Sequence, residues 1–183
     1  MITFAISGFG DRGSTYASMQ NNFPDKMKVV AVADINPDKV NKAKKLYCLK
    51  DDNCFDSAED MLKKDKLADI MVISTMDRYH VEPAIAAIKK GYHILLEKPI
   101  SPEINECLNI QDIAKEHNVH VIVCHVLRYT EFYNTIKDII SSGKIGDIVS
   151  VCASENVGYW HQAHSFVRGN WRNSKETRPM ILQ

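Results

Sequence analysis

The sequence predicts an α/β fold in which helices cover both faces of a doubly wound parallel sheet. Short runs rich in apolar and β-branched residues alternate with segments that have the period of an amphipathic helix. One of these runs, residues 28–33, is apolar almost throughout, which is typical of a parallel strand buried on both faces. Alternation of this kind indicates a parallel sheet whose crossover helices pack on its two faces.

The expected elements follow one another regularly as far as residue 124. Strands are expected at residues 2–7, 28–33, 53–55, 69–74, 93–96, 119–123 and 147–153. Helices are expected to begin near residues 12, 36, 57, 81, 101 and 132. After residue 155 the pattern becomes polar, aromatic and irregular. We therefore expect one complete domain at residues 1–124 and the start of a second, truncated α+β domain at residues 125–183.

Local signals place the ends of several helices. Pro37 falls in the first turn of one expected helix, and Ser101-Pro102-Glu103 has a cap, a first-turn proline and a first-turn acid. Asp56 or Ser57 is the expected cap of the short helix that reaches about residue 62. Gly91 lies just past the apolar stripe of residues 81–88, where a helix commonly ends.

Composition excludes several classes of function. The chain has 183 residues, and 23 basic side chains balance 23 acidic ones, so no nucleic-acid or anionic-membrane partner is indicated. No apolar run approaches the roughly 20 residues that cross a bilayer. The five cysteines form no CxxC pair, so we expect free, mostly buried thiols and a reducing, cytoplasmic location. No metal site is expected, because His161 and His164 lack further ligands at suitable spacing.

A glycine loop between the first strand and the first helix is the clearest functional signal. It has the pattern G-x-G-x-x-G in the residues Gly8, Phe9, Gly10, Asp11, Arg12 and Gly13. Its first glycine permits a tight turn, its second lets the backbone approach a pyrophosphate, and its third lets the helix pack close to the strand. The pyrophosphate would lie at the helix N-terminus, where N–H groups favour an anion. We therefore expect a Rossmann domain that binds a dinucleotide.

The end of the second expected strand carries the supporting acid. Asp34 lies about 20 residues after the glycine loop, where a carboxylate accepts the ribose hydroxyls of adenosine and repels a 2′-phosphate. Ile35 follows it and offers no cation for such a phosphate. We expect NAD to be the cofactor, with NADP disfavoured.

Two further polar clusters leave strands at the same edge of the expected sheet. Ser74, Thr75 and His80 follow the strand at residues 69–74, and Glu97, Lys98 and Pro99 follow the strand at 93–96. Open α/β sheets bind ligands at the carboxyl ends of their strands. A lysine there can orient a bound hydroxyl group or accept its proton. His80 either lines this cleft or caps and packs against the following helix.

With these motifs the sequence resembles the glucose-fructose oxidoreductase / inositol 2-dehydrogenase family (Gfo/Idh/MocA). The resemblance rests on the glycine loop, Asp34, residues 75–80, the segment at 87–99 ending in Glu-Lys-Pro, residues 125–129 and the turn at 142–146. It implies a nicotinamide-dependent oxidoreductase that acts on a sugar, polyol or cyclitol, and a homo-oligomeric full-length parent.

The resemblance also implies roles for single residues. Lys98 would lie near the nicotinamide and the reacting hydroxyl, and Pro99 would follow a cis peptide bond. Glu97 would position backbone and cofactor. Arg128 would meet the substrate or hold the domain junction. Trp171-Arg172 resembles a pair found near the cofactor.

The family's next element would begin near residues 178–182, and most of its second-domain sheet would lie beyond them. We therefore expect this chain to bind cofactor but to turn over substrate poorly, as a fragment of a longer enzyme or as a short cofactor-binding protein. Two other functions stay open for the parent. One is glycoside hydrolysis through transient oxidation by bound NAD. The other is non-catalytic dinucleotide sensing.

Overall fold

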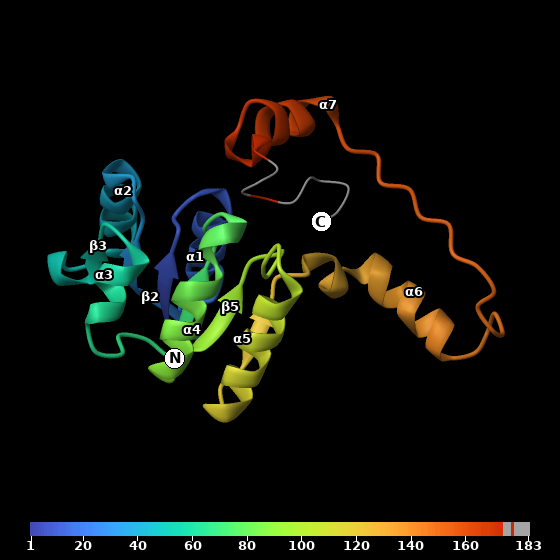
Figure 1. The fold of residues 1–183 in the computed structure, drawn as a ribbon, viewed down its shortest axis with the longest axis horizontal. Helices are drawn as coiled ribbons and strands as arrows, with labels where there is room; N and C mark the ends of the chain where they lie inside the picture. The colour runs from blue at the N-terminus through green and yellow to red at the C-terminus, as the bar shows by residue number, and fades with distance from the viewer. Residues whose placement is uncertain (174–176, 178–183) are drawn as a thin grey trace.

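The structure of the chain, a computed structural model, describes residues 1–173 and 177 (Figure 1). Its strands are Ile2–Ser7 (β1), Met27–Ala33 (β2), Cys54–Phe55 (β3), Ile70–Ile73 (β4), His93–Leu96 (β5) and Val121–Val123 (β6). Its α-helices are Asp11–Asn22 (α1), Pro37–Tyr47 (α2), Ala58–Lys63 (α3), Val81–Lys89 (α4), Ile104–Glu116 (α5), Glu131–Ser141 (α6) and Tyr159–His161 (α7). The 3₁₀ turns are Asp51–Asn53 (η1), Asp77–Tyr79 (η2), Val126–Tyr129 (η3) and Asn170–Arg172 (η5), and Gln162–Val167 (η4) is a π-helix.

The six strands form one parallel sheet in the order β3-β2-β1-β4-β5-β6. The chain builds outward from β1 to β3 in one direction and then from β4 to β6 in the other. The expected doubly wound fold is therefore confirmed. Its strand order reverses between β1 and β4, which is where such sheets open a crevice for a ligand.

Helices cover the sheet on both faces, because neighbouring residues along each buried strand point in opposite directions. On one face, Ala5 and Met71 pack in a core that α3, α4 and α5 complete. On the other face, Ile6 and Val72 pack in a core that α1 and α2 complete. All four side chains are fully buried. The two cores fix the strands in register and therefore fix where each strand ends.

The local signals set some helix ends correctly and others approximately. The Ser57 side chain caps α3 by accepting a backbone N–H at 3.1 Å, and Gly91 has the positive φ, 80°, of a helix stop. The expected start at Ser101 is three residues early. There the Ser101 hydroxyl accepts the backbone N–H of Glu103 at 2.9 Å in a separate turn, and α5 begins at Ile104.

Residues 147–153, which we predicted to form a strand, form no strand. The apolar side chains of Val149 and Val151 are almost fully exposed there. A strand requires a neighbouring strand to pair its N–H and C=O groups, and no strand of the described residues lies beside this segment. The apolar pattern therefore reflects the β-propensity of these residues, but the prediction of a strand is wrong.

The chain beyond Cys124 lies largely outside the two cores. In Figure 1, α6 and the extended segment after it project away from the sheet, and α7 with η4 lies near it again. The apolar side chains of α6, including Phe132, Ile136 and Ile140, are exposed. Residues 178–182, where the sequence predicts the family's next element, lie outside the described residues. The division into two domains at residue 124 stays a prediction.

The cysteine side chains are free, as expected, but only one of them is buried. Cys124 is buried, Cys54 and Cys107 are half-buried, and Cys48 and Cys152 are exposed. The expectation of mostly buried thiols is therefore wrong. No helix among the described residues is both long enough and apolar enough to cross a membrane.

One polar contact ties the start of the sheet to the loop before β4 and predicts a pH dependence. The Asp69 carboxylate accepts the hydroxyl of Thr3 at 2.7 Å and its backbone N–H at 2.8 Å, and these bonds lower the pKa of Asp69. A lowered pKa in the folded state stabilises the protein above the carboxyl's unfolded pKa, and this stabilisation is lost as the pH falls through the folded value.

We therefore expect Asp69→Asn to lower the free energy of unfolding more at pH 7 than at pH 3. Urea unfolding of both proteins at the two pH values measures this difference. An equal loss of stability at pH 7 and pH 3 would show that the carboxylate charge plays no part in the contact.

Candidate functional site

The candidate site is built on the residues that immediately follow five neighbouring strands. Asp34, Gly8, Ser74, Glu97 and Cys124 follow β2, β1, β4, β5 and β6 in their spatial order. The last four each donate a backbone N–H to the final residue of an adjacent strand, at 2.8 or 2.9 Å. The ladder of the sheet therefore continues one residue past the strands. It sets these residues in a row, although they are far apart in sequence.

The three glycines of the loop after β1 serve different steric needs. Gly8 has φ +87°, and a Cβ there would lie 2.8 Å from the carbonyl group of Ser74. A Cβ on Gly13 would lie 1.9 Å from the carbonyl oxygen of Gly8. At Gly10, by contrast, the nearest atom to an added Cβ is Nζ of Lys39, at 3.8 Å. The first and third glycines pack the loop, and the second leaves open space above the helix.

That open space fits the pyrophosphate of a dinucleotide. Gly10 is the N-cap of α1 and provides no side-chain cap. The N–H groups in the first turn of a helix have no partner within the helix, and the helix dipole favours an anion beside them. A bare glycine cap at the end of a 12-residue helix can therefore hold a phosphate group.

The Asp34 carboxylate, just after β2, is held against this loop by two backbone N–H groups. Its Oδ2 accepts the backbone N–H of Phe9 at 2.7 Å, and its Oδ1 accepts that of Asn36 at 2.9 Å. These bonds fix the carboxylate and leave it with further lone pairs for ribose hydroxyls. Nζ of Lys39 lies 3.9 Å from Oδ2. Ile35 beside it is 90% exposed.

Phe9 contributes to the loop through its backbone. Its side chain is buried in the core beneath α1 and α2, and its ring packs edge-on against Tyr47 at a centroid distance of 6.2 Å. This packing anchors the loop from below, while Asp11 and Arg12 are exposed at its rim.

The predicted site residues after β4 hold the neighbouring turns in place. The Ser74 hydroxyl donates to the carbonyl of Gly8 at 2.8 Å, and the Thr75 hydroxyl donates to that of Tyr79 at 3.2 Å. His80 is fully buried, with its ring nitrogens 2.9 Å from the Pro99 carbonyl oxygen and 3.0 Å from that of Thr75. Its ring joins the turns after β4 and β5, so any effect of His80 on a cofactor would pass through them.

The turn after β5 combines a buried carboxylate with an exposed lysine. The Glu97 side chain is only 8% exposed and accepts the backbone N–H of Lys98 on Oε2, at 3.0 Å. Its Oε1 accepts the hydroxyl of Tyr16, and Nε of Arg12 lies 3.9 Å away. Lys98 is exposed, and its peptide bond to Pro99 is cis, as the resemblance implies.

Tyr16 was not singled out from the sequence. Burial raises the pKa of its hydroxyl, and hydrogen bonds with Cys124 and Glu97 raise it further, so the hydroxyl stays protonated as a donor. Burial likewise raises the pKa of the Cys124 thiol. Helical periodicity is the sequence feature that could have identified Tyr16. It lies three residues after Gly13, and therefore on the face of α1 that packs against the strand ends.

Trp171, which the resemblance implies to lie near the cofactor, contacts the turn after β4 from a distant part of the chain. Its indole N–H donates to Oδ1 of Asp77 at 3.2 Å, and Asp77 is buried in the turn that follows β4. Arg172 is exposed. Arg128 is exposed in η3, just after β6. Asp77 was not predicted from the sequence, since nothing local marks it as the partner of a residue so distant.

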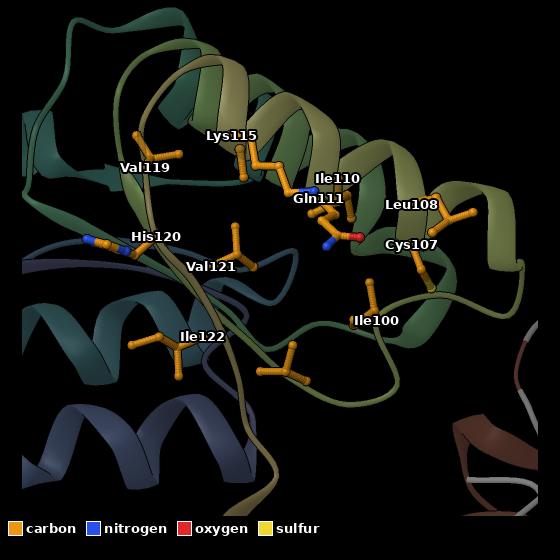
Figure 2. Close-up of a pocket in the computed structure, with 12 residues that line it drawn as sticks. Ile100, Cys107, Leu108, Ile110, Gln111, Lys115, Val119, His120, Val121 and Ile122 are labelled. Carbon is orange, nitrogen blue, oxygen red and sulfur yellow. The ribbon is translucent and has the colours of Figure 1, made fainter.

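A surface groove of the described residues lies away from this row. It has a volume of about 510 Å³ and runs along α5 and β6, lined mainly by apolar side chains such as Ile110, Val121 and Ile122 (Figure 2). None of the predicted cofactor-binding residues lines it. The residues that line this groove include no carboxylate for a ribose and no helix N-terminus for a pyrophosphate, so the groove does not fit a dinucleotide.

Comparison with known proteins identifies what this arrangement resembles. The family model described as "Oxidoreductase family, NAD-binding Rossmann fold" (GFO_IDH_MocA) matches residues 2–125. This match confirms the resemblance that the motifs indicated.

Several characterised proteins match along most of the chain. The 2,7-anhydro-N-acetylneuraminate hydratase of Escherichia coli (strain K12) is 28% identical over 96% of this chain and 44% of its own length. An inositol 2-dehydrogenase of Serratia proteamaculans (strain 568) is 28% identical over 85% of this chain and 46% of its own length. The crystal structure of scyllo-inositol dehydrogenase from Lactobacillus casei with bound NAD(H) and scyllo-inositol superimposes with a TM-score of 0.74 at 26% identity, over 81% of this chain and 43% of that one. The chain thus spans less than half the length of these relatives.

The glycine loop gives a paired test of the site. An added methyl group at Gly13 would overlap the Gly8 carbonyl, so we expect Gly13→Ala to lower the free energy of unfolding by about 3 kcal/mol or more. A methyl group at Gly10 would meet only Nζ of Lys39, at an ordinary contact distance of 3.8 Å, but would fill the space expected for the pyrophosphate. We therefore expect Gly10→Ala to keep wild-type stability within about 0.5 kcal/mol and to weaken NAD binding at least about tenfold.

Urea unfolding and calorimetric titration with NAD, applied to both variants, separate the two effects. If Gly10→Ala binds NAD as the wild type does, the space above α1 is not the pyrophosphate site.

Proposed function

Because the chain belongs to the Gfo/Idh/MocA oxidoreductase family, with its NAD-binding Rossmann fold, we propose that it is the cofactor-binding part of a dehydrogenase. The enzyme would move a hydride between a hydroxyl-bearing carbon of a sugar, polyol or cyclitol and a nicotinamide ring. The inositol 2-dehydrogenase relative and the structural neighbour that holds NAD(H) and scyllo-inositol support this proposal.

The observation that carries the proposal is the row of residues at the strand ends. It combines a carboxylate after β2, an open helix N-terminus after β1 and a lysine after β5. From β2 to β5 the row crosses three strand spacings, or about 14 Å. A dinucleotide bound across the carboxyl ends of these strands would place its ribose at Asp34 and its pyrophosphate at α1. Its nicotinamide end would then extend toward Lys98.

Each residue of the row has a distinct role in this proposal. Asp34 accepts the adenosine ribose hydroxyls, and the first-turn N–H groups of α1 donate to the pyrophosphate. When bound, the nicotinamide ring supplies the hydride acceptor. Lys98 is exposed at the end of β5, where its amine can orient the substrate hydroxyl and take part in transferring its proton.

We propose NAD as the preferred cofactor, because the fixed carboxylate of Asp34 repels a 2′-phosphate and the neighbouring Ile35 offers it no charge. Lys39 partly offsets this repulsion, since its ammonium group lies 3.9 Å from Asp34 Oδ2.

Calorimetric titration of the chain with NAD, NADH, NADP and NADPH tests this preference. We expect NAD(H) to bind at least about tenfold more tightly than NADP(H), and Asp34→Ala to reduce that ratio by weakening NAD. Tighter binding of NADP(H) would contradict the assignment of Asp34 as the selecting group.

The position proposed for Lys98 can be tested without turnover. We expect bound NADH to slow the acetylation of the Lys98 amine, because the nicotinamide end would cover it, and to leave the exposed Lys137 on α6 unaffected. Mass spectrometry after brief treatment with acetic anhydride measures both rates. Equal labelling of Lys98 with and without saturating NADH would place this lysine outside the cofactor cleft.

A second candidate function rests on the similarity to the Escherichia coli hydratase. An enzyme that oxidises its substrate transiently, for hydration or for glycoside cleavage, would return its NAD unchanged after each turnover. A dehydrogenase would accumulate NADH. The ratio of NADH formed to substrate consumed distinguishes the two, and the alternative of non-catalytic sensing predicts no consumption of substrate.

A further inference from the structure

We infer that Tyr16 is a positioning residue of the site, acting through Glu97 to hold the turn that carries Lys98. This inference rests on the proposed function, because the turn matters only if the nicotinamide end of a dinucleotide lies against it. Tyr16 belongs to α1, the helix whose N-terminus faces the proposed pyrophosphate position. Its hydroxyl therefore links the phosphate-binding helix to the lysine-bearing strand.

Two hydrogen bonds connect Tyr16 to the backbone of Lys98 through the Glu97 carboxylate. The Tyr16 hydroxyl donates to Glu97 Oε1, and Oε2 of the same carboxylate accepts the backbone N–H of Lys98 at 3.0 Å. Both oxygens are thus engaged, one by the helix and one by the turn. Glu97 is buried, so water does not readily replace either donor.

The surroundings of the Tyr16 hydroxyl make it hard to replace. The alternative donor is Arg12, whose Nε lies 3.9 Å from Oε1 and whose side chain is 57% exposed. Cys124, which follows β6, also hydrogen-bonds with the Tyr16 hydroxyl. Without this hydroxyl, the carboxylate would turn toward Arg12 and solvent and release the Lys98 N–H, since a buried carboxylate requires a donor.

The predicted consequence is confined to one half of the dinucleotide. The adenosine and pyrophosphate groups would bind through the Asp34 carboxylate and the first-turn backbone N–H groups of α1, and not through the turn after β5 that Glu97 holds. The nicotinamide ring alone would lie against the turn after β5. ADP-ribose has the first two groups and lacks that ring. It therefore reports on the half of the site that Tyr16 does not control.

The test compares NAD and ADP-ribose binding to Tyr16→Phe by calorimetry. We expect NAD to bind about fivefold more weakly and ADP-ribose to bind within about twofold of wild type, as one lost hydrogen bond implies. Tyr92→Phe is the matched control, because the buried Tyr92 hydroxyl accepts the Leu67 N–H at 2.7 Å just before β5, at the opposite edge of the sheet. It also removes one hydroxyl contact, and we expect it to leave both affinities unchanged.

A double-mutant cycle with Glu97→Gln identifies the route of the effect. A glutamine has one acceptor oxygen, so it cannot receive the Tyr16 hydroxyl and the Lys98 N–H on two separate oxygens as Glu97 does. If Tyr16 acts through Glu97, NAD binding in the double variant is no weaker than in Glu97→Gln alone.

Additive losses in the double variant, or equal losses of NAD and ADP-ribose affinity in Tyr16→Phe, would overturn the inference and leave Tyr16 a general contributor to stability. A wild-type chain that binds neither NAD nor ADP-ribose would overturn the proposed function and this inference together. A chain that binds both and shows no change in Tyr16→Phe would overturn the inference alone.

Discussion

The close approach of the glycine loop to the turn after β4 is the constraint on which the site depends. The backbone at Gly8 passes so near Ser74 that no side chain fits between them, and α1 packs so near Gly8 that none fits at Gly13. Hydrophobic burial on both faces of the sheet fixes the strands in register. Because the glycine loop packs so closely on the turn after β4, this register also fixes the position of the N-terminus of α1. The position of the helix end that we propose to bind the pyrophosphate is thus a consequence of sheet packing.

Polar contacts then fix the remaining strand ends to one another. Asp34 holds the loop after β1 through Phe9, and His80 joins the turns after β4 and β5 through two carbonyl groups. Glu97 joins α1 to the turn after β5. Each of these side chains is largely buried, so its hydrogen bonds are costly to break. A site preorganised in this way loses little conformational entropy when a ligand binds.

The sequence predicts the parts of this arrangement that are local. A glycine pattern, the acid after β2 and the lysine after β5 can all be read within one strand–helix unit, and the order of such units predicts the parallel sheet. The contacts between units cannot be read in that way. The Tyr16–Glu97 and Trp171–Asp77 hydrogen bonds join residues 81 and 94 positions apart, and their geometry follows from packing on both faces of the sheet. For the same reason, the apolar pattern at residues 147–153 predicts a strand, although no strand within the described part of the chain lies beside it.

The most direct test of the central claim is an NMR titration of the ¹⁵N-labelled chain with NADH, which maps the site residue by residue. The account predicts that the backbone amides of the glycine loop and of Ile35, Thr75 and Lys98 shift together in one saturable transition. It also predicts that amides along the groove between α5 and β6 do not shift. Shifts confined to that groove, with the glycine loop unchanged, would contradict the assignment of the strand ends as the dinucleotide site.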